Sequence, residues 1–191
     1  MDPLELFDNW YREEKMASGA ALPGACCFTT LGLDGFPNSR FVSLKEVKEN
    51  CFIITGSTAA RKGQEIAAHS KVALAFWWPV TGKQVRIQGI ATPVSAAAAD
   101  RYFAERDRAA RVVSALCEQG KPVADYDQML EQFQYLLEHQ RDVGDERPAN
   151  WGGYAIAPVR IELMVFSETR LHERNYFEQQ DGRWVHQKLQ P

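Results

Sequence analysis

The sequence predicts a mainly antiparallel β protein with helices (α+β), a barrel or sandwich with the helices packed outside. Two groups of short strand-like segments lie on either side of a helical insert at about 95–140. Asp34-Gly35 and Asp181-Gly182 are typical of tight hairpin turns, and each lies between two such segments. The 191 residues contain no repeat or linker, so we expect a single domain over residues 1–191.

The N-terminal segment is predicted to be a capped helix. Asp2 is a residue type that caps helices, and Pro3 suits the first helical position. Apolar residues then recur at helical spacing on one face, namely Leu4, Phe7, Trp10 and Tyr11. The stretch from Gly19 to Gly24, which includes Pro23, is expected to end this helix.

The first strand group lies between this helix and the helical insert. Runs of apolar or alternating residues predict strands at 26–31, 40–44, 51–55, 72–78 and 84–90. A short helix is expected between the third and fourth strands, from Ala60 to His69. The alternation of the fifth strand breaks after Gly89, which indicates a β-bulge.

The helical insert and the second strand group complete the chain. Ser95 can cap a helix that runs to Arg106, and helical patterns recur at 109–119 and 126–139. A polar loop from Arg141 to Asn150 leads to strands that are predicted at 154–156, 160–166, 174–177 and 184–189.

Composition disfavours several classes of protein. A chain with 45% hydrophobic and 25% charged residues is typical of soluble globular proteins rather than disordered ones. No apolar run approaches the roughly 18 residues of a membrane span, and the start of the sequence lacks the pattern of a secretory leader. The four cysteines form no C-x-x-C pair, so we expect reduced thiols, a cytoplasmic protein and no metal site. The motifs of phosphate loops, dinucleotide sites, zinc proteases and serine hydrolases are absent.

Positive charge is concentrated in the middle of the chain. Residues 40–111 hold twelve Lys and Arg against six Asp and Glu, although the whole chain has a net charge of −3. This distribution disfavours general nucleic-acid binding and is compatible with a small anion such as a phosphate ester. A solvated surface is the alternative, and composition alone favours it.

A candidate anion site lies where the third predicted strand meets the short helix. The turn Thr55-Gly56-Ser57-Thr58 is rich in small and hydroxyl residues, and Arg61 and Lys62 open the helix. Free N–H groups at a helix start attract anions, whereas cations there oppose the helix dipole unless an anion neutralises them. The pattern favours a bound anion, with a solvated turn as the alternative.

Two further clusters are candidate ligand sites. In an extended segment Arg170, His172 and Arg174 share one face, where an anionic ligand would relieve their mutual repulsion. Tyr102 and Arg106 are four residues apart on a predicted helix, so both are expected on one face, where they can hold a phosphate. The alternatives are a solvated edge strand for the first cluster and an ordinary amphipathic surface for the second.

These patterns recur together, in the same order, in one family. From Asp2 to Pro191 the chain resembles the pyridoxamine 5′-phosphate oxidases, flavoproteins with an FMN-binding split β-barrel. The matching segments are Asp2-Pro3-Leu4-x-Leu6-Phe7-x-x-Trp10, Asp34-Gly35-x-Pro37-x-x-Arg40-x-Val42-x-Leu44-Lys45, Arg61-Lys62-Gly63-x-Glu65, Gln84-Val85-Arg86-Ile87-x-Gly89, Tyr102-Phe103-x-x-Arg106, Trp151-Gly152-Gly153, Arg170-Leu171-His172-Glu173-Arg174 and the ending Trp184…Leu189-x-Pro191.

The resemblance implies a homodimer with two FMN sites at the subunit interface. The implied FMN contacts, of which Gln119 reaches across from the partner subunit, are Arg40, Thr55, Arg61, Lys62, Gln84, Gln119 and Arg174. The residues similar to those that hold the substrate phosphate are Lys45, Tyr102 and Arg106. The residues similar to those placed over the substrate ring, with a catalytic role as orienting and electrostatic groups, are Arg170 and His172.

The implied reaction is the oxidation of pyridoxamine or pyridoxine 5′-phosphate to pyridoxal 5′-phosphate. Hydride passes to flavin N5, and dioxygen reoxidises the flavin with release of hydrogen peroxide. The chain departs from the family pattern at Ile54, Ala110 and Met164, where the family has tyrosine, serine and tryptophan, and over 111–121, which retains chiefly Gln119.

These departures leave two other functions open. One is an FMN-dependent oxidoreductase of another substrate, similar to the phenazine-biosynthesis oxidases. Those relatives lack the lysine that corresponds to Lys45, so its presence favours a phosphorylated substrate. The other is a protein that binds flavin or pyridoxal phosphate without turnover.

Overall fold

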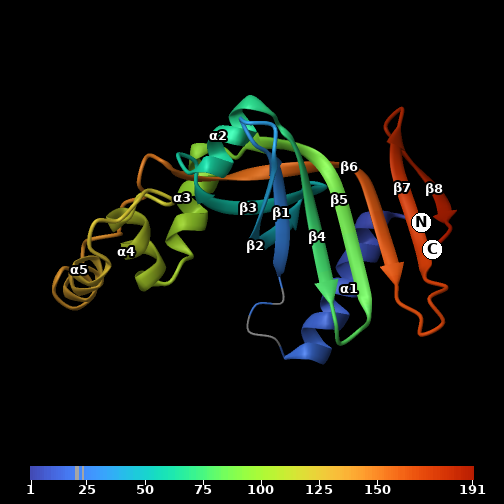
Figure 1. Cartoon of the computed structure of the whole chain (residues 1–191), viewed down its shortest axis with the longest axis horizontal. Helices are drawn as coiled ribbons and strands as arrows, with labels where there is room; N and C mark the ends of the chain where they lie inside the picture. Colours follow the sequence, from blue (N-terminus) through green and yellow to red (C-terminus); the bar gives the residue numbers. More distant parts are fainter. Residues whose placement is uncertain (20–21, 23) are drawn as a thin grey trace.

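An antiparallel sheet of eight strands organises the chain (Figure 1). The computed structural model describes residues 1–19, 22 and 24–191. The strand order is β3-β2-β1-β4-β5-β6-β7-β8, and an additional pairing of β3 with β6 closes the first six strands into a barrel. The strands are β1 (Ala25–Leu31), β2 (Pro37–Lys48), β3 (Cys51–Ser57), β4 (Lys71–Trp78), β5 (Lys83–Pro93), β6 (Trp151–Val165), β7 (Glu173–Gln180) and β8 (Arg183–Leu189). The predicted class is confirmed, as a barrel rather than a sandwich.

Five helices occur in the described residues: α1 (Pro3–Ser18), α2 (Arg61–Ala68), α3 (Ala96–Ala104), α4 (Arg108–Leu116) and α5 (Tyr126–His139). Asp2 and Ser95 are confirmed as caps, since their side chains accept hydrogen bonds from the amides of Leu4 and Ala98. Gly19 ends α1 in a left-handed conformation, with φ of 58°, while residues 20, 21 and 23 of the expected break lie outside the described part. Within that part, no helix is both long and apolar enough to cross a membrane.

The second strand group differs from expectation at β6. The predicted strands 154–156 and 160–166 form one strand, because a β-bulge bridges the gap between them. Gln88 pairs with Arg160 and Gly89 with Pro158, which leaves Val159 as an extra residue. Proline donates no ladder hydrogen bond, so the bulge is the part of the strand that accommodates Pro158. The register shift between Gln88 and Gly89 confirms a bulge at the predicted place, with its extra residue on β6 rather than on β5. A Cβ at Gly89 would lie 2.5 Å from the carbonyl oxygen of Ala157, which explains the glycine.

The helical insert extends from one side of the barrel. Figure 1 shows α4 and α5 at one end of the molecule and β7 and β8 at the other, with β6 running between the two ends. A small buried cluster of Ile53, Tyr102, Phe103 and Trp151 packs α3 against β3 and β6. This cluster holds α3 near the end of β3, where the candidate anion site was expected.

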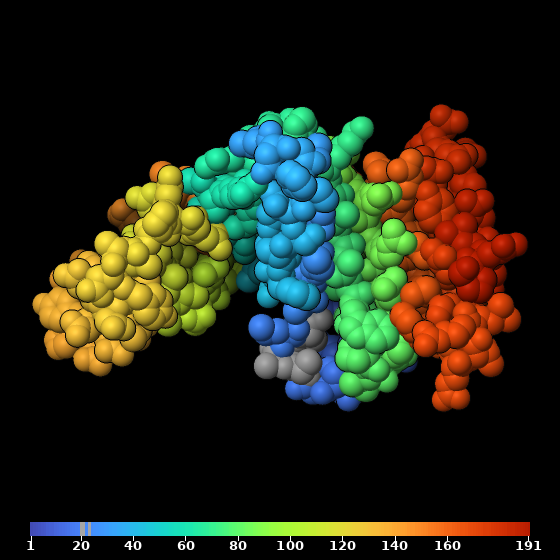
Figure 2. Space-filling model, viewed as in Figure 1, coloured from blue at the N-terminus to red at the C-terminus, as the bar shows by residue number. Residues whose placement is uncertain are grey.

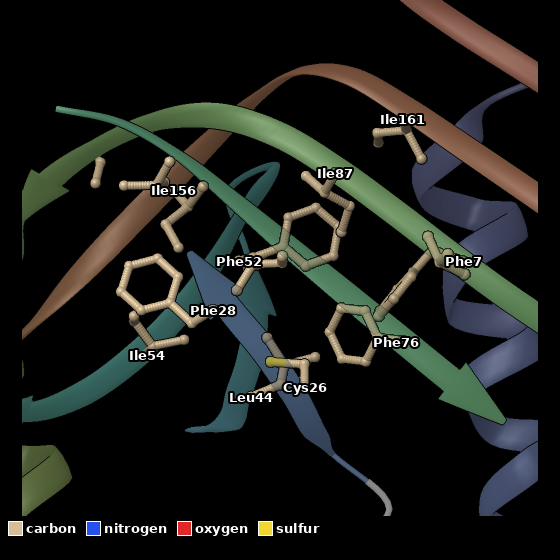
Figure 3. Close-up of a cluster of buried hydrophobic side chains, with 14 of the residues drawn as sticks. Phe7, Cys26, Phe28, Leu44, Phe52, Ile54, Phe76, Ile87, Ile156 and Ile161 are labelled. Atoms are coloured by element: carbon tan, nitrogen blue, oxygen red, sulfur yellow. The ribbon is translucent and has the colours of Figure 1, made fainter. Parts of the chain in front are cut away.

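The barrel interior is the main hydrophobic core, and α1 contributes to it through Phe7. The Phe7 side chain has no exposed surface, and its ring centroid lies 4.9 Å from that of Phe52 and 5.2 Å from that of Phe76. Figure 3 shows Phe7 directed from α1 towards Phe76 and the other rings of the core. The periodic apolar face of the N-terminal segment therefore has the packing role that helical spacing indicates.

Replacing Phe7 with alanine is expected to lower the free energy of unfolding by about 3–5 kcal/mol, because the truncation leaves a cavity between α1 and the barrel. Urea unfolding followed by circular dichroism measures the change. The matched control is Met16→Ala on the same helix, since Met16 is 81% exposed. Its expected change is below about 0.5 kcal/mol. Equal losses in the two variants would contradict this packing.

Candidate functional site

A cleft lies between the end of β3, the start of α2 and the helical insert. It has a volume of about 430 Å³, and Figure 2 shows the molecule hollowed between the insert and the barrel. Four residues of the expected site line it, namely Thr55, Lys62, Arg106 and Gln119. They come from β3, α2 and the segments that flank α4, so the fold brings together residues that are far apart in the sequence. We call this cleft the α2 cleft.

Lys62 is the buried cation of the α2 cleft. Its Nζ donates a hydrogen bond of 2.7 Å to Oε1 of Gln119 in the same chain. Burial lowers the pKa of Lys62, and the neighbouring positive charge of Arg40 lowers it further. A Cβ at Gly63 would lie 1.9 Å from the Thr58 carbonyl oxygen, so the turn packs tightly on α2. A buried ammonium group next to another cation is suited to an anionic ligand.

Arg106 faces the α2 cleft from the far side. Its guanidinium carbon lies 5.1 Å from the centroid of the Trp151 ring, and Nη2 donates to the Ala110 carbonyl at 3.3 Å. Among the described residues, its buried Nε has no hydrogen-bond partner. Burial lowers the pKa of this guanidinium. A phosphate oxygen is an acceptor that would satisfy such a donor.

A buried carboxylate on α2 holds two more of the expected cations. Glu65 has no exposed surface and pairs with Arg40 Nη2 at 3.1 Å and with Arg61 Nε at 2.9 Å. Burial alone would raise the pKa of Glu65, but hydrogen bonds from Thr30, Arg61, Asn38 and Arg40 lower it to about 2. Arg61 also pairs with Asp34 and lines a second cleft, which it shares with Gln119.

The expected phosphate cluster is only partly assembled. Lys45 Nζ lies 5.9 Å from the centroid of the Tyr102 ring, so these two residues are close. The expectation that Arg106 shares a helix face with Tyr102 is wrong, because α3 ends at Ala104. The Tyr102 hydroxyl donates to Glu46 at 2.5 Å, whereas Arg106 lies over Trp151.

A second group of expected residues lies on the sheet at the other end of β6. Gln84, Met164 and Arg174 are paired across β5, β6 and β7, and residues in one row share a face. Arg174 Nε donates to Glu162 at 2.7 Å. Met164, which stands where the family has tryptophan, is thus placed between two expected FMN contacts. We call this row the β5–β7 face.

The segment before β7 is not extended, so the expected face of Arg170, His172 and Arg174 is not formed. Arg170 adopts a left-handed turn with φ of 68°, and Arg174 is the member that lies in a strand. His172 Nδ1 accepts a hydrogen bond of 3.0 Å from the Ser167 amide, and its ring lies 4.8 Å from that of Phe166. The left-handed turn lets the chain fold back on itself, which alternating strand geometry does not predict.

The α2 cleft and the β5–β7 face are separated within one chain. Trp151 lines the cleft at the start of β6, and Met164 lies at the other end of that strand, about 40 Å along it at the usual rise per residue. Figure 1 shows β6 crossing the molecule between the two regions. The residues expected around one FMN therefore form two half-sites.

Comparisons with known proteins identify the family. Residues 13–138 match the family model for pyridoxamine 5′-phosphate oxidase. The chain belongs to the pyridoxamine 5′-phosphate oxidase family. Residues 151–191 match the model for the pyridoxine 5′-phosphate oxidase C-terminal dimerisation region.

Curated relatives of this family resemble the chain over its whole length. A pyridoxine/pyridoxamine 5′-phosphate oxidase of Thermosynechococcus vestitus is 36% identical over 100% of this chain and 89% of its own. One of Caulobacter vibrioides is 38% identical over 100% of this chain and 85% of its own. The crystal structure of PhzG from Burkholderia lata 383 in complex with tetrahydrophenazine-1-carboxylic acid superposes with a TM-score of 0.92, at 25% identity, covering 100% of this chain and 93% of that one.

Some residues that line the α2 cleft do not belong to the family motifs. Ser114 lies one helical turn after Ala110 on α4, and its Oγ donates to the Ala110 carbonyl at 2.9 Å. A spacing of four on a helix that faces a ligand is the signal that could have identified it. Ile54, the departure from the family tyrosine, is 1% exposed and packs in the barrel core. Its side chain is therefore part of the hydrophobic core.

The Glu65 network predicts a pH-dependent stability difference. Replacing Glu65 with glutamine is expected to lower the free energy of unfolding by about 2 kcal/mol at pH 7, because buried donors lose a charged acceptor. A folded-state pKa of about 2, below the ordinary value of 4.5, stabilises the fold above pH 4.5, and this contribution is lost as the pH falls towards 2. Urea unfolding of both proteins should show their difference shrinking over that interval.

The control for this experiment is Glu178→Gln, which removes a partly exposed ion pair with Arg160 on β6. Its effect is expected to stay within about 1 kcal/mol at neutral pH. A Glu65→Gln difference that stays constant from pH 5 to pH 2 would contradict the assigned pKa.

Proposed function

We propose that this chain is an FMN-dependent oxidase that converts pyridoxamine or pyridoxine 5′-phosphate to pyridoxal 5′-phosphate. The observation that carries the proposal is the α2 cleft, where the buried Lys62 and the Nε of Arg106, which has no hydrogen-bond partner in the described part of the chain, offer donors to an anion. The family membership supports the identity of that anion as the phosphate of a flavin or of a pyridine substrate.

Residues at the start of α2 would hold the FMN phosphate. Lys62 supplies a buried ammonium, Arg40 and Arg61 are oriented by Glu65, and Thr55 offers a hydroxyl at the end of β3. Gln119 lies against Lys62 of its own chain, so it would bind beside that phosphate. Gln84 and Arg174 on the β5–β7 face would contact the rest of the cofactor. FMN, when bound, supplies a ring that accepts a hydride and passes the electrons to dioxygen.

A homodimer would join the two half-sites. A two-fold axis places the same surfaces against each other twice, so the α2 cleft of one chain can meet the β5–β7 face of its partner at two equivalent places. The match of residues 151–191 to a dimerisation region supports this arrangement, since that region contains β6, β7 and β8.

The chain's own groups would orient the substrate. Lys45, Tyr102 and Arg106 would take its phosphate, and Arg170 and His172 would lie over its ring. Because His172 Nδ1 accepts the Ser167 N–H, the neutral imidazole carries its proton on Nε2 and donates from that atom. His172 is therefore suited to hydrogen bonding and orientation rather than to proton abstraction. Holding substrate and cofactor in register is the main contribution that the protein can make.

A second candidate is an FMN-dependent oxidase of a substrate that bears a carboxylate. The observation that favours it is the similarity of the whole chain to PhzG. Lys45 distinguishes the two functions, because a lysine at this position suits the phosphate of a pyridoxine-type substrate.

Anaerobic titration with pyridoxamine 5′-phosphate is expected to bleach the flavin absorption of the purified holoprotein, with peroxide forming once air is admitted. Lys45→Ala should raise KM for pyridoxamine 5′-phosphate by about tenfold, since a charge-assisted hydrogen bond to phosphate is lost. The control is Lys71→Ala on β4, outside both half-sites. Bound flavin that no concentration of this substrate bleaches would refute the proposed activity and favour binding without turnover.

Mixed dimers test the division of the site between subunits. Lys62→Met and Arg174→Ala homodimers are each expected to bind FMN at least tenfold more weakly than the unaltered protein. Co-expressing the two variants with different affinity tags and isolating the doubly tagged dimers should restore one tight site per dimer. In that dimer, one site contains both unaltered half-sites. Flavin fluorescence titration counts the sites, and no recovery would mean that each site is built within one chain.

A further inference from the structure

We propose that Glu105 is a specificity-determining residue, whose carboxylate competes with the substrate phosphate for Lys45. The inference rests on the proposed function and deepens it, because it concerns how strongly the site discriminates phosphorylated from unphosphorylated ligands. It means that the phosphate end of the site is closed by an internal ion pair, which a ligand must displace.

The first observation is the ion pair itself. Lys45 Nζ lies 2.7 Å from Oε2 of Glu105, and the two side chains are 31% and 44% exposed. Glu105 follows the last residue of α3 as its C-cap. The carboxylate thus occupies the ammonium group that would meet a phosphate, and this ammonium itself lies 5.9 Å from the centroid of the Tyr102 ring.

The second observation is that a second carboxylate occupies the rest of the cluster. Glu46, beside Lys45 on β2, accepts hydrogen bonds from Tyr102 at 2.5 Å and from Arg101 at 3.1 Å. Burial, together with the hydrogen bond to Glu46, raises the pKa of Tyr102 to about 12, so its hydroxyl remains a donor. Lys45 and Arg101 therefore face two carboxylates that balance their charge. Arg106, which lies over Trp151, is the cation of the expected phosphate cluster that stands outside this balanced group.

The two carboxylates differ in how firmly they are held. Glu46 has two donors from α3, whereas the contact that holds Glu105 is its ion pair with Lys45. A half-exposed side chain at a helix end can change rotamer at small cost, and an exposed ion pair of this kind is weak. Glu105 is therefore the displaceable partner, and Glu46 fixes the Tyr102 hydroxyl in place.

A phosphate that approaches Lys45 meets the negative charge of Glu105. Like charges at this range repel, and the repulsion is reduced but not removed at a partly exposed site. Binding of phosphate therefore includes the opening of the Lys45–Glu105 pair. An unphosphorylated ring places no charge there and leaves the pair closed.

The test is the affinity of the purified holoprotein for two ligands that differ by the phosphate. Glu105→Gln keeps the size of the side chain and removes its charge, so it should bind pyridoxal 5′-phosphate about tenfold more tightly. Its affinity for pyridoxal should be unchanged. Glu105→Asp, which keeps the charge, should remain close to the unaltered protein. Ligand absorption during equilibrium dialysis measures each dissociation constant without any turnover.

The matched control is Asp8→Asn, which removes one carboxylate from an exposed ion pair with Arg12 on α1. It changes the net charge by the same amount, so it isolates the local effect from the overall charge. If Glu105→Gln bound pyridoxal 5′-phosphate no more tightly, or gained equally for pyridoxal, the inference would be overturned. If Glu105→Gln gained affinity but pyridoxamine 5′-phosphate never bleached the flavin, the proposed function would fail while the inference stood.

Discussion

The carboxylate of Glu65 has no exposed surface, yet side chains of three different elements donate hydrogen bonds to it. Thr30 comes from β1, Asn38 and Arg40 come from β2, and Arg61 opens α2 on which Glu65 itself lies. A buried charge is tolerated when its hydrogen bonds are complete, so these donors must converge together. Their convergence fixes the start of α2 against the barrel. The position of Lys62 in the α2 cleft depends on it.

The cations of the candidate site fall into two classes as a result. Arg40, Arg61 and Arg174 have carboxylate partners within the chain, at distances of 3.1 Å or less. Lys62 and Arg106 instead contact an amide oxygen and a backbone carbonyl, and neither forms an ion pair with any of the residues that the structure describes. The paired cations are held in place by the fold, and the two without an ion pair are the donors most available to an anion. This difference in pairing, rather than the number of cations, is what points to an anion.

Local signals in the sequence predicted much of the fold. Asp2, Ser95 and the two Asp-Gly turns act through contacts with residues only a few positions away. They can therefore be recognised in the sequence without knowledge of the tertiary structure. The strand–turn–helix unit that carries Thr55 and Lys62 was predicted for the same reason, since its residues are close together in the sequence. The pairing of Glu105 with Lys45 and the left-handed turn at Arg170 depend on contacts across the fold or on a single backbone dihedral, which residue periodicity does not encode. The half-sites depend on the course of β6 through the whole molecule.

The bulge at Val159 changes which positions of β6 face the core. Before it, the even-numbered Tyr154 and Ile156 face the core, and after it the odd-numbered Ile161 and Leu163 do so. This change coincides with a change of neighbours, because the first half pairs with β3 and the second with β7. Removing this one residue would not shorten a loop. It would remove the bulge and leave a regular ladder, in which Pro158 and Arg160 become consecutive residues opposite Gly89 and Gln88 while Ile161 and Leu163 still face the core. The extra residue therefore adds local bend and twist to β6, so its loss would change the curvature of the barrel wall rather than the composition of either face.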